Sequence, residues 1–307
     1  MPSLYDLLLK TSRTFALAIP LLPEPTRSTT CLAYLLFRVA DTLEDAGTWS
    51  RVARLDALAE WSELLVAPDP ARARAASVRW TANEATHHDG YNELLAAVPE
   101  VLTELARAEA GIQHIVREHA LRTVRGMRET LERGDAGGNV RITSVEDLRA
   151  YCYIVAGIVG ELLTELFVHD CPSLASVKDT LVENQVKFGE GLQLVNILKD
   201  EAQDAEEGRM YLPGGVLRSD IVELAREDLV GARRYIGALE RGGAPPGFSA
   251  FTSLSAELAE ATLARLQTDG PGAKVPRADV LRMFARYRLA ASAPAAADHS
   301  AIAQSGK

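Results

Sequence analysis

Apolar residues recur at intervals of three and four along most of the chain, and no stretch alternates strictly between apolar and polar residues. This spacing places apolar side chains on one face of a helix and therefore predicts an all-α fold. Ala and Leu dominate while aromatic residues make up only 6%, which also favours helices. The predicted helices cover residues 26–45, 56–66, 101–133, 151–168, 192–204, 220–240, 248–267 and 277–289.

Turn-forming residues separate these helices. The clearest linker is 134–144, where Thr143 or Ser144 followed by two acidic residues provides a helix N-terminus. Residues 67–77 are expected to form a loop or a short helix start, and a break is expected within 86–93. No repeat of fixed period is present, so we expect a single domain over 1–290, followed by a small, polar and disordered tail over 291–307.

One stretch, 192–213, carries polar residues where a buried helix should be apolar. Gln193, Asn196, Asp200 and Asp204 lie on one face of a helix with 3.6 residues per turn, while Leu, Val and Ile surround them. An ionised carboxylate among apolar side chains costs several kcal/mol unless a partner compensates its charge. A metal ion is the candidate partner.

A second stretch repeats the arrangement, with Tyr34, Arg38, Asp41 and Asp45 on one helical face. Either Asp-x-x-x-Asp motif alone is typical of a solvated helix end. Together they predict two helices whose carboxylates face one another, and Mg²⁺ is commonly held by one or two carboxylates together with substrate phosphates. The pair therefore indicates phosphate or diphosphate chemistry. Glu44 lies off the stripe and either supports the aspartates or is exposed.

Composition narrows the functional classes. A net charge of −9 argues against nucleic acid as a partner. Three cysteines without a CxxC spacing suit a reducing compartment, and residues 1–15 lack the pattern of a signal peptide. The apolar run 151–168 contains Glu161 and Glu165 and is short for a membrane span, so it is interpreted as a buried helix. We therefore expect a cytoplasmic protein.

Two further patterns have ordinary interpretations. From the residues alone, Tyr151 is a tyrosine of the hydrophobic core. Glu84 and His87 form one ExxH motif, but a di-iron bundle needs two such motifs and two further glutamates. A carboxylate-bridged metal bundle without phosphate chemistry is therefore disfavoured.

Several segments together resemble the squalene and phytoene synthase family, the head-to-head trans-prenyl synthases. The resemblance extends from Ser12 to about Phe284 and rests on segments that occur in the family's order. These segments are SRTF at 12–15, YLLFRVADTLED at 34–45, YCYIVAG at 151–157, LQLVNILKD at 192–200, DAEEGRMYLP at 204–213 and, more weakly, KVPRADV at 274–280.

The resemblance implies a single all-α domain of the isoprenoid synthase type with a central active-site cavity. It further implies that Mg²⁺ bound by Asp41, Asp45, Asp200 and Asp204 holds the diphosphates of two prenyl donors. Tyr151 matches the family's catalytic tyrosine, for which proton transfer or steering of a carbocation is expected. The positions matched to substrate binding are Ser12, Arg13, Tyr34, Arg38, Gln193, Asn196, Lys199 and Arg209.

Some positions depart from the family pattern. Lys199 stands where many members have arginine, and Gln203 stands where many have glutamate. Ser253, Ser255 and Glu257 make the segment after Phe251 more polar than usual, which puts the depth of the cavity in question.

The leading hypothesis is condensation of two farnesyl diphosphates through presqualene diphosphate to squalene, with NADPH as reductant. The alternatives are phytoene from geranylgeranyl diphosphate, dehydrosqualene or hydroxysqualene, and, from another class, a catalytically silent binding or assembly subunit. Lipidic substrates predict transient contact with the inner face of the membrane, although no basic amphipathic patch stands out in the sequence.

Overall fold

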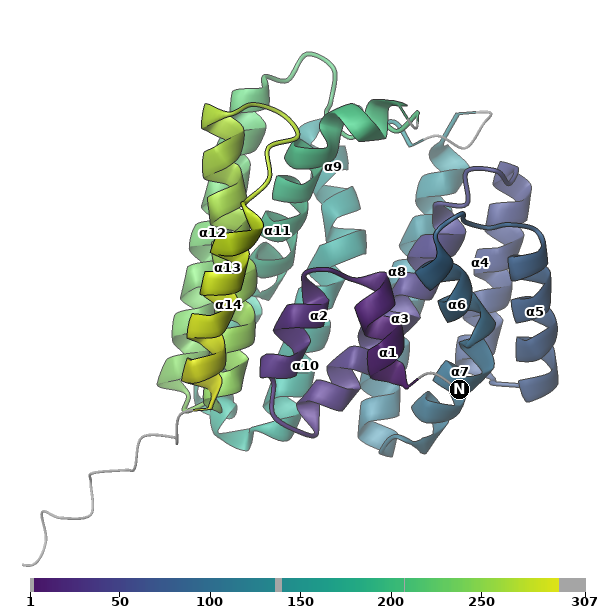
Figure 1. The fold of residues 1–307 in the computed structure, drawn as a ribbon, viewed down its shortest axis with the longest axis horizontal. Coiled ribbons are helices and arrows are strands. Elements are labelled where there is room, and N and C mark those ends of the chain that lie inside the picture. The colour runs from purple at the N-terminus through teal and green to yellow at the C-terminus, as the bar shows by residue number, and fades with distance from the viewer. Residues whose placement is uncertain (1–2, 136–139, 207, 293–307) are drawn as a thin grey trace, which may run out of the picture.

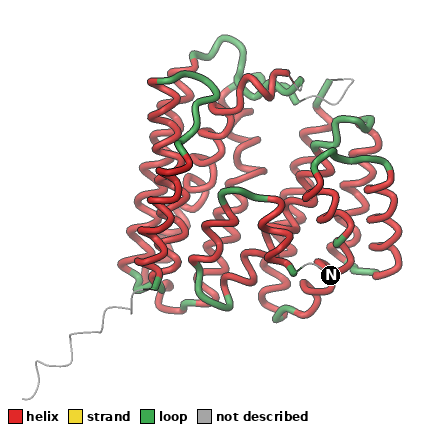
Figure 2. The backbone as a smooth tube through the Cα atoms, viewed as in Figure 1, coloured by secondary structure: helices red, strands yellow, loops and turns green. Residues whose placement is uncertain are grey.

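The computed structural model describes residues 3–135, 140–206 and 208–292, and these residues form an all-helical domain (Figure 2). Within these ranges the only β-type pairing is an isolated bridge between Arg141 and Met210. The helices are α1 (Leu4–Thr11), α2 (Phe15–Ala18), η1 (Ile19–Leu21), α3 (Thr26–Glu44), α4 (Arg51–Val66), α5 (Pro70–Ala82), α6 (Asp89–Ala96), α7 (Val98–Arg107), α8 (Ala110–Arg133), α9 (Val145–Cys152), η2 (Tyr153–Gly157), α10 (Ile158–Asp170), η3 (Pro172–Val177), α11 (Lys178–Glu206), α12 (Arg218–Arg241), α13 (Pro246–Thr268) and α14 (Arg277–Ala291).

The two helices with acidic motifs belong to different halves of the domain (Figure 1). Helix α11 packs on α12, α10 and α13, whereas α3 packs on α1, α4 and α8. Each half supplies apolar faces to the core, in which Trp61, Phe167 and Tyr235 are fully buried. The two acidic helices are thus held in place by different sets of neighbouring helices.

Glycines allow the helices around α11 to approach closely. A Cβ atom at Gly160 would lie 1.9 Å from the carbonyl oxygen of Gln185, and one at Gly189 would lie 2.0 Å from that of Ala156. Because no side chain fits at such distances, glycine at these positions brings α10 and η2 against α11.

Helix η2 is a π-helical turn between α9 and α10. The hydroxyl of Thr123 on α8 donates a hydrogen bond of 3.1 Å to the Ile154 carbonyl, which helps to satisfy the backbone of the widened turn. Such turns often occur at functional sites, and this one directly follows Tyr151.

The structure corrects several expected boundaries. Helix α11 begins at Lys178 rather than near 192, α4 begins at Arg51 rather than 56, and α6 begins within the expected break at 86–93. Residues 101–133 do not form one helix, because α7 ends at Arg107 and the extended backbone of Ala108 and Glu109 precedes α8. The segment expected to be a loop or short helix start is the full helix α5, whose first amides donate to Asp69 Oδ1 at 2.8 Å. The predicted start at Ser144 is confirmed, since its hydroxyl accepts from the Asp147 amide at 3.1 Å.

The run Val145–Asp170 is long and apolar enough to span a membrane, with a mean hydropathy of 1.6 over its best window. Helices α9, η2 and α10 form this run, and 56% of the window is buried inside the domain. It is therefore a core helix, as the sequence predicted. Most of the tail expected to be disordered, residues 293–307, lies outside the described residues.

Candidate active site

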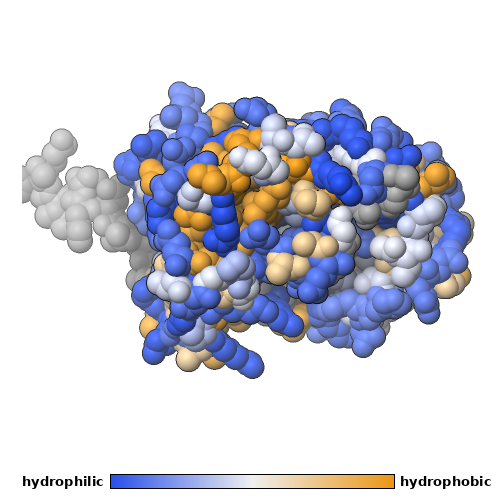
Figure 3. Space-filling model, turned by 90° about the horizontal axis from the view of Figure 1, so that it is seen from above, coloured by the Kyte–Doolittle hydropathy of each residue, from blue (hydrophilic) through white to orange (hydrophobic). Residues whose placement is uncertain are grey.

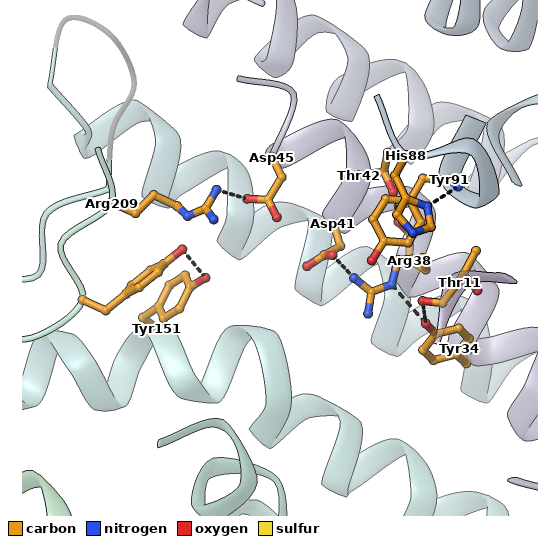
Figure 4. A network of polar contacts seen from close by, with 11 residues as sticks. Thr11, Tyr34, Arg38, Asp41, Thr42, Asp45, His88, Tyr91, Tyr151 and Arg209 are labelled. Atoms are coloured by element: carbon orange, nitrogen blue, oxygen red, sulfur yellow. Dashed lines mark hydrogen bonds and ion pairs between the residues drawn. The ribbon is translucent and has the colours of Figure 1, made fainter. Parts of the chain in front are cut away.

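Helix α3 presents its polar face as a connected cluster (Figure 4). Arg38 donates to the Tyr34 hydroxyl at 3.2 Å and forms an ion pair with Asp41, while Tyr34 donates to the Thr11 carbonyl at 2.8 Å. The guanidinium also lies 5.3 Å from the ring centre of Tyr91 on α6. Burial opposes its charge, but Asp41 and the two tyrosines raise the pKa of Arg38, so it remains a fixed cation.

The end of α11 carries the second polar face. The ammonium group of Lys199 lies 3.1 Å from a carboxylate oxygen of Asp200 and donates to the Asn196 amide oxygen at 3.1 Å. Asp204 lies one turn later and is only 15% exposed, compared with 40% for Asp200. Lys199 is thus a cation next to the motif.

Arg209 joins the two motifs. It donates to Asp204 Oδ1 at 3.1 Å through Nη2 and lies 3.4 Å from Asp45 Oδ1 through Nη1. Figure 4 shows this side chain extending from the segment after α11 toward the end of α3. One carboxylate from each acidic helix, Asp45 and Asp204, therefore contacts the same arginine. The ends of the two helices face one another with a cation between them.

Tyr151 lies beneath Arg209. Its ring stacks on that of Tyr211 with centroids 4.7 Å apart, and its hydroxyl donates to the Tyr211 hydroxyl at 3.1 Å. Burial, and then the neighbouring Tyr211, Glu44 and Asp45, raise the pKa of Tyr151 well above its ordinary value. Its phenol is therefore neutral at physiological pH. Tyr211 was not predicted as a site residue, although it stands within the segment 204–213.

Glu44 is buried, at 5% exposure, and so is not the exposed acid that the sequence allowed. Its Oε1 has no hydrogen-bond partner among the described residues. Burial, followed by the charges of Asp45 and Asp41, raises the pKa of Glu44 well above its ordinary value. A protonated Glu44 avoids an uncompensated charge behind the two aspartates.

The remaining predicted binding residues lie less close to the acids. The Ser12 hydroxyl accepts from the Phe15 amide at 2.9 Å, Arg13 is exposed and Gln193 is half-buried. Within the described ranges, no hydrogen bond or ion pair joins these three side chains to the acidic motifs. Their substrate contacts stay predictions.

Seen from above, on the face that carries the end of α11, apolar side chains gather in a hollow framed by hydrophilic residues (Figure 3). The acidic motifs, with Arg38, Lys199 and Arg209, form a charged cluster at the ends of α3 and α11, which we call the rim. This arrangement suits a substrate with a charged head and a hydrocarbon chain.

Residues 8–283 match the family model described as squalene/phytoene synthase. The chain belongs to this family of prenyltransferases. Squalene synthase ERG9 of Candida albicans is 31% identical over 215 residues, which cover 68% of this chain and 44% of that protein. Human squalene synthase is 30% identical over 213 residues, which cover 68% of this chain and 45% of the human protein. The chain therefore aligns with less than half the length of either relative.

A solved structure of TcSQS with the ligand E5700 shares the fold, with a TM-score of 0.75 and 24% identity over 94% of this chain and 87% of that one. At this identity the likeness concerns the fold alone. It confirms the all-helical domain that the sequence predicted.

Members of the squalene/phytoene synthase family typically depend on Mg²⁺. Within the described residues, no three His, Cys, Asp or Glu side chains gather closely enough to form a metal site by themselves. The donors at the rim are all carboxylate oxygens in two pairs, which is the hard-oxygen chemistry Mg²⁺ prefers when substrate phosphates complete its coordination. The residues therefore fit the ion as a co-ligand of substrate.

Proposed function

We propose that the protein condenses two farnesyl diphosphates head to head, through presqualene diphosphate, to squalene with NADPH as reductant. The observation that carries this proposal is the position of Arg209, which lies between Asp45 and Asp204 next to the buried pair of Tyr151 and Tyr211. A site for diphosphate departure and a protected phenol are thus adjacent.

The aspartates and cations of the rim can exchange their present ion pairs for contacts with Mg²⁺ and diphosphate. Each of its four aspartates pairs with a cationic side chain: Asp41 with Arg38, Asp200 with Lys199, and Asp45 and Asp204 with Arg209. When diphosphate binds, the cations can turn to its oxygens while the carboxylates hold Mg²⁺, which supplies charge neutralisation to the leaving group. Asp41, Asp45, Asp200 and Asp204 would hold the metal.

Tyr151 provides a hydroxyl rather than a phenolate. A neutral phenol can take up a proton from a carbocation only by passing its own proton on. The Tyr211 oxygen accepts a hydrogen bond from Tyr151 at 3.1 Å, and Tyr211 would in turn release its own hydroxyl proton to the departed diphosphate, which is the final base. We assign Tyr151 to this relay during closure of the cyclopropyl ring. The apolar interior excludes water, which would otherwise capture the cation.

Two of the polar residues of α13 have polar partners on α13 or α14. The Glu257 carboxylate pairs with Arg286 and accepts from the Tyr287 hydroxyl at 2.6 Å, and Ser255 donates to the Phe251 carbonyl at 3.1 Å within its own helix. These contacts support a chamber that is not shortened by Glu257 or Ser255. A farnesyl chain remains our proposed donor.

The test is to incubate the purified protein with Mg²⁺ and either farnesyl or geranylgeranyl diphosphate, with and without NADPH, and to identify the products by mass spectrometry. We expect squalene from farnesyl diphosphate only when NADPH is present. Phytoene from the longer donor, or dehydrosqualene or hydroxysqualene from farnesyl diphosphate, would replace the proposed product. No diphosphate release from either donor would point to a silent binding subunit.

A further inference from the structure

Helix α14 carries a stripe of exposed apolar residues on its outer face. Ala278, Leu281, Ala285 and Leu289 follow intervals of three and four and are all exposed, with Leu281 and Leu289 at 47% and 74%. None of the residues of α14 is fully buried. The opposite side of the helix, through Met283, Phe284 and Tyr287, packs on the core.

Arginines flank this stripe on both sides. By helical position, Arg277 and Arg288 lie along one edge, and Arg282 and Arg286 along the other. Asp279 is the single acidic residue of the helix, so α14 has a net charge of +3 within a chain of net charge −9. Positive charge is thus concentrated next to the exposed leucines.

A cavity of about 390 Å³ adjoins the second edge, between α13 and α14. Arg265, Arg282 and Arg286 line it together with Glu257 and Asp279. Arg286 pairs with Glu257, and Arg282 pairs with Asp279, while Arg265 pairs with Asp269 at 2.8 Å. Three guanidinium groups therefore lie beside the apolar stripe, each paired with a carboxylate.

We propose that the outer face of α14 docks on an anionic lipid membrane, with the leucines entering the acyl boundary and the arginines contacting headgroup phosphates. A helix with an apolar stripe between basic edges lies in the plane of the interface. Charge complementarity selects anionic lipid over a neutral surface. The sequence alone did not single out this surface, because the pattern of α14 is visible only once its core-facing side is known.

This surface deepens the proposed function, since its substrates and product are lipids. It lies on the flank of the domain opposite α5 and α7 (Figure 1). Binding to vesicles needs neither Mg²⁺ nor substrate, so it is tested separately from the reaction.

The test measures co-sedimentation of the full chain with vesicles of phosphatidylcholine, with and without phosphatidylglycerol. We expect binding only to the anionic vesicles and weaker binding at higher salt. The double variant Arg282→Gln/Arg288→Gln should lose about fivefold in partitioning for each arginine. The double variant Leu281→Asn/Leu289→Asn should lose about tenfold or more for each leucine.

Matched controls carry equivalent changes on the opposite flank, at exposed positions of α4, α5 and α7. They are Val66→Asn/Val78→Asn and Arg72→Gln/Arg107→Gln, and both should bind vesicles as the parent does. Thermal unfolding checks that every variant is folded. Absence of binding, equal binding to neutral vesicles, or equal loss in the controls would overturn the proposal. Light scattering checks for a dimer. If the parent is a dimer, does not bind vesicles, and becomes monomeric in the Leu281→Asn/Leu289→Asn variant, the outer face of α14 contacts a second copy of the chain instead.

Discussion

Two groups of acidic residues in this protein pair with arginine in opposite settings. At the rim, Asp45 is 47% exposed and shares Arg209 with Asp204. Between α9, α11 and α12, Glu190 and Asp228 are 7% and 1% exposed and share Arg149 at 2.7 and 3.3 Å.

The two groups differ in whether their carboxylates can leave the arginine and bind another partner. Side chains at the rim reach solvent, so their ion pairs can open to admit Mg²⁺ and diphosphate at little cost. In the buried group, one arginine serves two carboxylates that are almost entirely removed from solvent. Burial accordingly raises the pKa of Glu190 to about 7, despite the opposing effect of Arg149. The rim is suited to chemistry, and the buried group to holding the helix of Tyr151 against α11 and α12.

The largest expected effect is at the rim. Asp41→Asn or Asp200→Asn should each lower diphosphate release from farnesyl diphosphate by about 1,000-fold, because a carboxylate that we propose as a metal ligand is lost. The melting temperature should change little. Asp56→Asn, at an exposed position of α4, is the control. Turnover that is unchanged in both rim variants would contradict the metal assignment.

Removing the cation of the buried group should act on stability. Arg149→Met leaves two carboxylates buried without their partner and should lower the free energy of unfolding by about 3–5 kcal/mol. Lys199→Met at the rim should cost less than about 1 kcal/mol. Urea unfolding measures both, and equal losses would remove the distinction between the two regions.

Tyr151→Phe should lower the first condensation by about 100-fold while the fold is kept. The control is Tyr235→Phe, a tyrosine with 0% exposure that bonds to Thr164 away from the rim. Presqualene diphosphate formation is the readout. Normal product from Tyr151→Phe would return this residue to a packing role.

The pH dependence of stability should come from the buried group. Glu190 titrates near 4.5 when unfolded and near 7 when folded, so the folded state holds the extra proton and unfolding free energy falls as pH rises between these values. The expected loss is about 1–3 kcal/mol. Glu190→Gln should reduce the slope measured by urea unfolding from pH 5 to 8, leaving the parts due to Asp228 and Glu44, whose pKa values are also raised. An unchanged slope would show that Glu190 is not the titrating group.

The smallest effect is expected for Lys199→Arg, which should change turnover by less than about threefold, since either side chain supplies the cation beside Asp200. Lys178→Arg, exposed at the start of α11, serves as the control. A gain above tenfold would mean that the second motif needs a bidentate partner.

The sequence predicted the helices where periodicity and turn residues agreed, such as α3 and α12. It missed the end of α7 because Ala108 and Glu109 are both good helix formers, and only tertiary packing extends the chain there. It missed α5 because Pro70 and Asp69, which suggested a loop, are the first residue and the cap of a helix.

The sequence predicted those residues of the candidate site that share one face of a single helix. Asp41, Asp45, Asp200 and Asp204 share faces that spacing reveals, and Arg209 lies within the recognised segment. The stacking of Tyr211 on Tyr151 and the burial of Glu44 depend on contacts between distant segments. The spacing of residues within one helix cannot predict such contacts.

The π-helical turn at Tyr153–Gly157 places one more residue in its turn than an α-helix would. If the same residues formed a regular α-helix instead, everything beyond the turn would be rotated by about 100° relative to Tyr151. Gly160 would then no longer meet the Gln185 carbonyl when the tyrosine faces Tyr211. The extra residue therefore fixes the rotation of Gly160 relative to Tyr151 along one continuous segment. The tyrosine can face Tyr211 while the glycine faces α11.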